Sequence, residues 1–290
     1  MKNAFGTTTI TAQPHRIVCI GWGSQDIALA LGVIPVGIPK GTFGDTDGFY
    51  PWETAVIGGQ PKPTLLDATT VPFEQIAALH PDVILAVQSG IEKSDYDKLS
   101  AIAPTVAYPD KPWLTPWPQQ TLLVGDALGM SAAAQALVDK TNALIAADAK
   151  ANPELAGKTF AYGTEDQPGT YDFYSAADPR VQLVEQLGLT LSPKITALFT
   201  DPASFYTQVS MEKLDQVDAQ IWIAYYAGAA AEKALKAQPV YAKVPAILRG
   251  ADVSLTDDTL TMATSSPSVL SLPWALTRFV PMLAAAAANS

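Results

Sequence analysis

The hydrophobic pattern of the chain alternates between short apolar runs and stretches with a helical period. In the first half, the apolar runs predict strands at residues 16–20, 33–38, 65–66, 82–87 and 105–107. Apolar residues spaced three and four apart predict helices between them, at residues 25–31, 73–79, 92–102 and 119–128. This order of strands and helices is typical of an α/β fold with a parallel sheet.

The same pattern starts again after Pro153. Strands are predicted at residues 158–163, 220–225 and 252–255, and helices at residues 179–187, 211–216, 229–236 and 273–288. Three segments rich in Gly, Pro, polar or aromatic residues are predicted as loops, at residues 40–60, 110–118 and 164–174.

One long helix is predicted between the two halves, at residues 131–152. Ser131 is a suitable N-cap because its hydroxyl can accept a hydrogen bond from a free amide of the first turn. Pro153 ends the helix because proline has no amide hydrogen. Such a helix is roughly 30 Å long. From this stretch alone, an ordinary surface helix explains the pattern equally well.

An internal similarity favours a connecting role for this helix. Residues 73–86 and 211–224 each predict a helix, a turn and a strand, and they align without a gap, with Glu74 and Glu212 at the same place. The two carboxylates can cap the positive ends of their helices, or they can form a pair of equivalent acidic sites, one in each half. The sequence therefore predicts an N-terminal α/β lobe at residues 14–130, a connecting helix at 131–152 and a C-terminal α/β lobe at 153–290.

Composition and charge narrow the function. The chain has 290 residues, is 48% hydrophobic and carries a net charge of −10, which argues against nucleic acid and anionic membranes as partners. Its single cysteine, Cys19, lies in an apolar run and is predicted to be buried. One cysteine and two histidines make a protein metal site unexpected. The first residues contain no apolar segment of a signal peptide, and the apolar stretch 274–288 is too short and too interrupted to span a membrane.

Several blocks resemble the class III (cluster A) substrate-binding proteins of ABC importers, which include receptors for ferric siderophores, haem and cobalamin. The blocks are residues 14–18, 28–37, 73–84, 209–212 and 268–276, and the most specific element is the one that contains Leu79-His80-Pro81-Asp82-Val83-Ile84-Leu85. The resemblance implies two Rossmann-like lobes with parallel-rich sheets, joined by one rigid helix, with ligand held in a cleft between the lobes. It also implies that Glu74 and Glu212 correspond to the two carboxylates that pair with arginines of the permease.

This resemblance implies an extracytoplasmic solute-binding protein, not an enzyme, which binds a ferric siderophore and delivers it to an ABC permease for iron uptake. A monomer is expected, lipid-anchored through a signal segment that is not in this sequence. No resident cofactor is expected, because iron enters only within the chelate. The scarcity of arginine favours a neutral or cationic complex of hydroxamate or mixed type over an anionic catecholate. Haem or cobalamin is the alternative ligand, and Tyr171 or Tyr225 could coordinate haem iron.

Ligand contacts are expected from loops at the carboxyl ends of the strands. Aromatic residues dominate these loops, which favours a wide and partly apolar ligand. For any single aromatic residue, packing in the core is an equally good explanation. The predicted ligand-binding residues are Trp22, Tyr50, Trp52, Gln88, Trp113, Tyr171, Phe173, Arg180, Tyr225 and Tyr226, with Ser89, Glu165 and Ser265 in the same loops.

An enzyme that acts on nucleotide sugars is the alternative from another functional class. Gly21-Trp22-Gly23 after the first strand is a poor dinucleotide fingerprint, because the third glycine is absent and a tryptophan would crowd a pyrophosphate. Loop carboxylates could serve as an acid and a base across a cleft, although solvated loop charges explain them as well. These carboxylates are Asp45, Asp47, Glu165 and Asp166.

Overall fold

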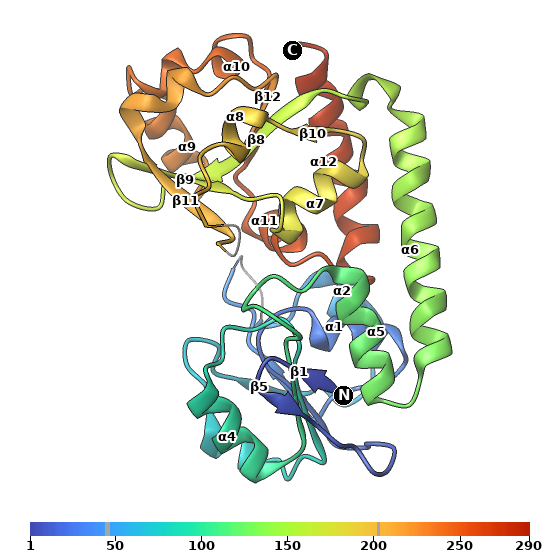
Figure 1. Cartoon of the computed structure of the whole chain (residues 1–290). Coiled ribbons are helices and arrows are strands. Elements are labelled where there is room, and N and C mark those ends of the chain that lie inside the picture. The colour runs from blue at the N-terminus through green and yellow to red at the C-terminus, as the bar shows by residue number, and fades with distance from the viewer. Residues whose placement is uncertain (44–46, 202–203) are drawn as a thin grey trace. The chain divides into compact units, whose positions relative to one another are not determined.

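The computed structural model describes residues 1–43, 47–201 and 204–290. The chain divides into two compact units (Figure 1). The first unit contains Met1–Asn142 and Ser266–Pro273, and the second contains Ala143–Ser265 and Trp274–Ser290. Ser266–Pro273, which the sequence analysis assigned to the C-terminal lobe, belongs to the first unit because the Ser268 hydroxyl donates a hydrogen bond to Asp26 at 2.6 Å.

The first unit is built on a five-stranded parallel sheet in the order β5-β4-β3-β6-β7. Its strands are β3 (Ile17–Cys19), β4 (Gly37–Pro39), β5 (Thr64–Leu66), β6 (Val83–Ala86) and β7 (Thr105–Ala107). Its helices are α1 (Ser24–Ala30), α2 (Pro51–Ile57), α3 (Phe73–Ala78), α4 (Lys93–Ile102) and α5 (Trp117–Ala127). A short antiparallel hairpin, β1 (Lys2–Asn3) and β2 (Gly6–Thr7), precedes this sheet.

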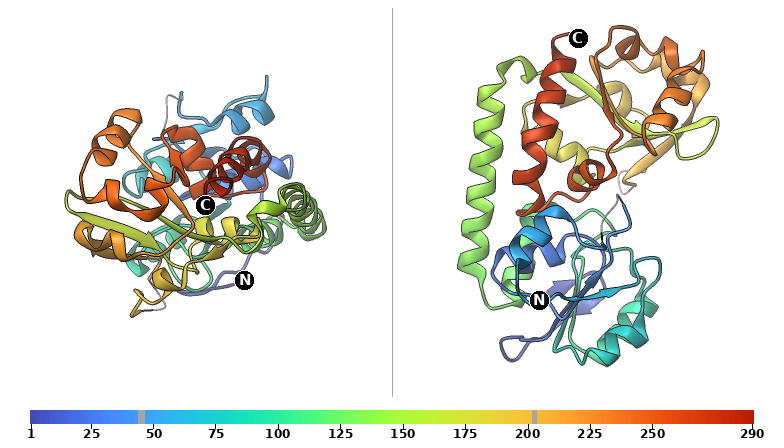
Figure 2. Two further views of the ribbon diagram at one scale, coloured as in Figure 1. Left: turned by 90° about the horizontal axis from the view of Figure 1, so that it is seen from above. Right: turned by 180° about the vertical axis from the view of Figure 1, so that it is seen from behind.

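Helices cover the central strands of this sheet, as a parallel sheet requires. Helix α1 packs against α2 and α5, whereas α3 packs against α4 (Figures 1 and 2). All residues of β3 and β6 are fully buried, including Cys19, as the apolar runs predict. The strand order reverses between β3 and β6, because the chain leaves β3 toward β4 and β5 and then returns to pair β6 on the other side.

The second unit contains a mixed six-stranded sheet with the order β11-β9-β8-β12-β13, and β10 pairs with β8. Its strands are β8 (Thr159–Thr164), β9 (Thr170–Tyr174), β10 (Thr190–Leu191), β11 (Tyr206–Ser210), β12 (Ile221–Tyr225) and β13 (Asp252–Leu255). Its helices are α7 (Pro179–Gln186), α8 (Pro193–Thr196), α9 (Ala229–Lys236), α10 (Pro245–Leu248), α11 (Asp258–Ser265) and most of α12 (Ser271–Ala287). The described residues of this unit also form the 3₁₀ helices η1 (Pro153–Leu155), η2 (Met211–Gln216) and η3 (Tyr241–Lys243).

The long helix α6 (Ser131–Ala151) matches its prediction to within one residue at its end (Figure 1). The predicted N-cap is wrong, because the Ser131 hydroxyl donates to the Asp126 side chain instead. The amide of Ala134 donates to the carbonyl of Met130, so the helical hydrogen bonds begin at Met130. The predicted role of α6 as a rigid connector stays a prediction.

Two predicted loops contain regular structure. The segment 40–60 includes helix α2, which begins with a proline in its first turn. The segment 164–174 includes strand β9, which runs antiparallel between β8 and β11. The helix predicted at residues 211–216 is the 3₁₀ helix η2. Among the described residues, no helix combines the length and hydropathy that a membrane span needs.

Candidate functional site

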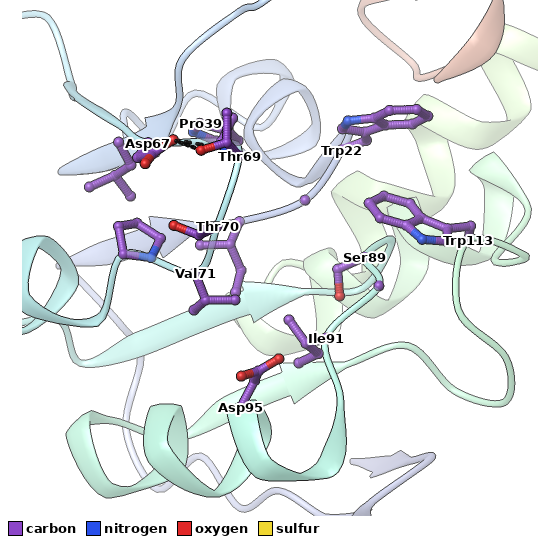
Figure 3. Close-up of a pocket in the computed structure, with 16 residues that line it drawn as sticks. Trp22, Pro39, Asp67, Thr69, Thr70, Val71, Ser89, Ile91, Asp95 and Trp113 are labelled. Atoms are coloured by element: carbon purple, nitrogen blue, oxygen red, sulfur yellow. Dashed lines mark hydrogen bonds between the residues drawn. The ribbon is translucent and has the colours of Figure 1, made fainter. Parts of the chain in front are cut away.

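A pocket of about 270 Å³ lies at the carboxyl ends of the strands of the first unit (Figure 3). Gly21 follows β3, Asp67 follows β5, Ser89 lies beyond β6, and Trp113 lies in the loop after β7. The pocket therefore includes the point between β3 and β6 where the strand order reverses. In open α/β sheets this is the usual place for a ligand, because the loops diverge there and leave a crevice.

Two tryptophans form one side of the pocket (Figure 3). The ring centroids of Trp22 and Trp113 are 4.9 Å apart, with the ring planes at 50° to each other, and both side chains are half-buried. A pair of partly exposed indoles offers apolar and π surface to a bound molecule. Both residues were predicted from the sequence as ligand contacts, and the structure brings them together.

The backbone around Trp113 fixes the position of its ring. Trp113 has φ 63°, in the left-handed region that few non-glycine residues adopt. Its ring lies against Gly90, where an added Cβ would stand 2.6 Å from the indole Nε1. Gly90 therefore provides the space in which the ring lies. Strained backbone of this kind is concentrated at functional sites.

Gln88 connects the two tryptophan loops. Its side-chain amide donates to the carbonyl of Trp113 at 2.8 Å and accepts from the amide of Thr115 at 3.0 Å. Its own carbonyl accepts from the amide of Trp22 at 2.8 Å. Only 2% of Gln88 is exposed, and both ends of its side chain have protein partners. We therefore assign to Gln88 a positioning role in place of the ligand contact predicted from the sequence.

Most of the polar lining of the pocket comes from residues that were not predicted from the sequence. The loop after β5 supplies Asp67, Thr69 and Thr70, and the first turn of α4 supplies Asp95. Asp67 could have been found from the sequence, because it directly follows the strand predicted at 65–66. Ser89, named with the cleft loops, also lines the pocket, and its hydroxyl donates to the carbonyl of Ala86.

Tyr50 and Trp52 pack inside the first unit, and the prediction that they stand in an open loop is wrong. Their rings stack at 4.8 Å, and each residue is only 6% exposed. The indole nitrogen of Trp52 donates to the carboxylate of Asp26 at 3.0 Å. Trp52 belongs to α2, whose first turn fixes it against α1.

Asp26 and Glu53 form a buried pair of carboxyl groups. They are 3% and 1% exposed. Burial raises the pKa of Asp26 to about 6, against hydrogen bonds from Ser268, Glu53 and Trp52 that lower it. Burial, and then the charge of Asp26, raises the pKa of Glu53 well above its usual range. The pair consequently holds a proton that two solvated carboxylates would lose at neutral pH.

Tyr171 and Phe173 are strand residues of β9, not loop residues, and both are fully buried. The indole of Trp222 donates to the hydroxyl of Tyr171 at 3.0 Å and also to that of Tyr241. Phe173 packs edge-on against Trp222, with ring centroids 5.3 Å apart. The prediction that these two aromatic residues face a ligand from a loop is therefore wrong, because the antiparallel strand carries them into the core.

The other predicted residues of the second unit differ in exposure. Tyr226 is buried, and its hydroxyl lies 2.8 Å from that of Tyr241. Tyr225 is half-buried at the end of β12 and accepts a hydrogen bond from the hydroxyl of Tyr174. Arg180 lies over the ring of Tyr174, 3.7 Å from its centroid. Of the two tyrosines at the end of β12, Tyr225 is the more accessible.

Arg180 makes a bidentate ion pair with Asp178, with N–O distances of 2.8 and 2.9 Å. Burial alone would lower the pKa of Arg180, but the Asp178 carboxylate raises it above its ordinary value. Only 11% of the Arg180 side chain is exposed. The positive charge of Arg180 is therefore balanced by the carboxylate of Asp178 within the second unit.

Glu74 and Glu212 stand in the first turns of α3 and η2, as the repeated pattern predicts. Both are exposed. Of the carboxylates considered for the enzyme alternative, Asp47 is exposed in the first unit, Glu165 is half-buried and Asp166 exposed in the second, and Asp45 lies outside the described residues. Within the described parts of the chain, no group of three or more His, Cys, Asp or Glu side chains could hold a metal ion.

Comparisons with known proteins agree with this arrangement. Residues 17–258 match the family described as periplasmic binding protein. The structure is similar to that of PiaA from Streptococcus pneumoniae in complex with ferrichrome, with a TM-score of 0.92, 33% identity, and coverage of 100% of this chain and 99% of that chain. A second PiaA structure, described as an iron uptake ABC transporter substrate-binding protein, has a TM-score of 0.88 at the same identity and coverage.

A curated relative is the probable siderophore-binding lipoprotein YfiY of Bacillus subtilis, 39% identical over 108 residues. That match covers 37% of this chain and 31% of the relative, so the chain matches less than a third of its length. The family consists of binding proteins, which confirms the predicted solute-binding class over the enzyme alternative, and it places the chain outside the cytoplasm. The two-lobed α/β fold class is confirmed as well. The chain belongs to the periplasmic binding protein family.

Proposed function

We propose that this protein captures a ferric siderophore of the hydroxamate or mixed type and delivers it to an ABC permease for iron uptake. The observation that carries the proposal is the pocket with the Trp22–Trp113 pair, at the strand ends where α/β proteins bind ligands. Similarity to PiaA over the whole chain supports the ligand class, because that protein was determined with ferrichrome bound.

The chemistry of the pocket suits a ligand that brings its own metal shell. In a ferric siderophore the chelator's oxygen atoms surround the iron, so the receptor supplies surface and hydrogen bonds rather than metal ligands. Two indole faces provide the surface, and the hydroxyls of Thr69, Thr70 and Ser89 provide polar groups. Iron is then cargo within the chelate, and the protein needs no resident cofactor.

Fluorescence titration tests this function directly. We expect a ferric trihydroxamate to quench tryptophan emission with saturation, because two of the six tryptophans line the pocket. A ferric tricatecholate and haem are expected to quench less at equal concentration. Replacing both Trp22 and Trp113 by Phe should remove most of the quenching, whereas the control Trp274→Phe, at a half-buried position in the second unit, should retain it. Absence of quenching by every ferric chelate would refute the siderophore proposal.

Delivery to the permease is assigned to Glu74 and Glu212. Both side chains are exposed in the first turns of equivalent elements, where they are accessible to arginines of a partner. We expect the double change Glu74→Ala, Glu212→Ala to leave the affinity for the ferric chelate within about twofold. Iron uptake by cells should fall at least about tenfold, since removing charges from an interface costs a few kcal/mol.

A control variant, Asp139→Ala with Glu154→Ala, removes two exposed carboxylates elsewhere and should keep normal uptake. Normal uptake by the Glu74, Glu212 variant would exclude these residues from docking. We further propose that the mature protein is anchored to the envelope by a lipid, as the name of the lipoprotein YfiY suggests, and that it acts as a monomer.

A further inference from the structure

The pocket of the first unit is acidic. Asp67 and Asp95 line it, and none of the sixteen lining residues that the structure describes is Lys, Arg or His. The acidity is local, because Lys62 and Lys98 of the same unit lie over the rings of Phe49 and Phe73, which do not line the pocket. A bound ligand therefore meets two negative charges without a balancing positive side chain in the lining.

Asp67 is held in a fixed and ionised state. Its carboxylate accepts hydrogen bonds from the amide and the hydroxyl of Thr69, at 2.8 and 2.7 Å. These hydrogen bonds lower the pKa of Asp67. Asp95 accepts from the amide of Glu92 at 3.1 Å at the start of α4, which orients its side chain. Both carboxylates are thus oriented by the backbone beside them.

The indole rings of Trp22 and Trp113 are a second feature of the pocket that suits a cation. Figure 3 shows Trp22 and Trp113 at one end of the pocket, with Asp67 and Asp95 farther around its lining. The faces of indole rings attract ammonium groups, and they do so more strongly where water is excluded. Carboxylates add direct charge attraction. Aromatic faces and carboxylates in one pocket are the combination that recognises an organic amine.

We propose that this pocket selects ferric chelates that carry a positively charged amine, with Asp67 and Asp95 supplying the preference. The inference rests on the proposed siderophore function and names the charge class of its ligand. A chelate with the same iron centre but without the amine binds through the tryptophans and the pocket hydroxyls, without the charge attraction of the aspartates. A chelate with a free carboxylate is disfavoured by the charges of both aspartates.

A matched pair of ligands tests the proposal. Ferric desferrioxamine B carries a terminal ammonium, and its N-acetylated form keeps the same trihydroxamate iron centre without that charge. We expect the wild-type protein to bind the amine form about tenfold more tightly in calorimetric titration at low salt. The preference should shrink as the salt concentration rises, because exposed charges are screened.

Substitution of the two aspartates tests whether they cause the preference for the amine form. In the double variant Asp67→Asn, Asp95→Asn, the side chains keep an oxygen that can accept the backbone hydrogen bonds. In this variant the affinities for the amine form and the acetylated form should become equal, so that the preference for the amine form is lost. The control Asp97→Asn makes a charge change on the same helix, at a carboxylate paired with Lys93, and should keep the preference.

The outcomes are distinguishable. Equal affinity of the wild type for both chelates overturns the inference and leaves the siderophore function standing. A preference that persists in the double variant shows that other residues recognise the amine, and it also overturns the inference. Failure to bind either chelate, or any other ferric siderophore, rejects the proposed function itself.

Discussion

Replacing Gly90 by alanine is expected to weaken the binding of a ferric hydroxamate by about tenfold or more, which corresponds to about 1.4 kcal/mol. A Cβ at this position would stand 2.6 Å from the Trp113 indole nitrogen and 2.9 Å from two ring carbons, so the ring must move. Gln88 holds the carbonyl of Trp113, and therefore the loop cannot simply shift with the ring. Calorimetric titration of the variant measures the loss.

The matched control is Gly59→Ala. Gly59 lies just after α2, and a Cβ there would meet no atom within 4 Å. This variant should bind the chelate normally. Both variants should unfold at nearly the wild-type temperature, because Gly90 is exposed and neither glycine has a positive φ. Wild-type affinity of Gly90→Ala would show that the ligand does not use the ring of Trp113.

Strands buried on both faces and helices with clear ends were predictable from the sequence. Thr105–Ala107 and Ala229–Lys236 have the predicted bounds, because the first is buried throughout and the helix formers of the second are unbroken. Asp252–Leu255 also has its predicted bounds, with Val253 and Leu255 buried in alternation. Strand β9 was missed, because its aromatic residues follow Pro168 and Gly169 and resemble a loop. The pairing that makes it a strand is with β8 and β11, a contact between segments that local pattern does not reveal.

The site was predictable only where position follows from topology. Trp22 and Trp113 follow strands of the parallel sheet, and the rule for strand ends selected them correctly as neighbours of one pocket. The same rule applied to Tyr171 and Phe173 failed, because it assumed a loop. The positioning role of Gln88 was not predictable, because it depends on hydrogen bonds between three loops and on the left-handed φ of Trp113.

The buried pair Asp26–Glu53 predicts an unusual dependence of stability on pH. The folded chain holds protons on these groups because burial raises the pKa of both. In the unfolded chain the two carboxyls have ordinary pKa values near 4 and lose their protons. Between about pH 4 and the raised folded values, the folded state binds more protons than the unfolded state. The stabilisation from this pair is therefore complete below about pH 4 and is lost as the pH rises.

Glu53→Gln should remove much of the stability that the wild type loses as the pH rises. The glutamine keeps an oxygen that can accept from Tyr50 and places an N–H where Glu53 accepts from Gln25. The buried Oε1 of Gln25, which has no hydrogen-bond partner among the described residues, can accept from this N–H once the Gln25 amide turns over. From pH 5 to pH 8 the variant should gain stability relative to the wild type. The gain should be about 1.4 kcal/mol for each pH unit over which the folded wild type keeps the Glu53 proton. Urea unfolding at several pH values measures it.

The control for this prediction is Glu154→Gln, which changes an exposed carboxylate in η1. Its free energy of unfolding should follow the wild type at every pH, because the side chain is solvated in both states. If the free energy of unfolding of Glu53→Gln also follows that of the wild type from pH 5 to pH 8, the two buried carboxyls do not retain a proton in the folded state. Asp26 and Glu53 would then both be ionised in the folded state. The hydrogen bond from Ser268 to Asp26, which links Ser266–Pro273 to the rest of the first unit, would in that case be made to a charged carboxylate.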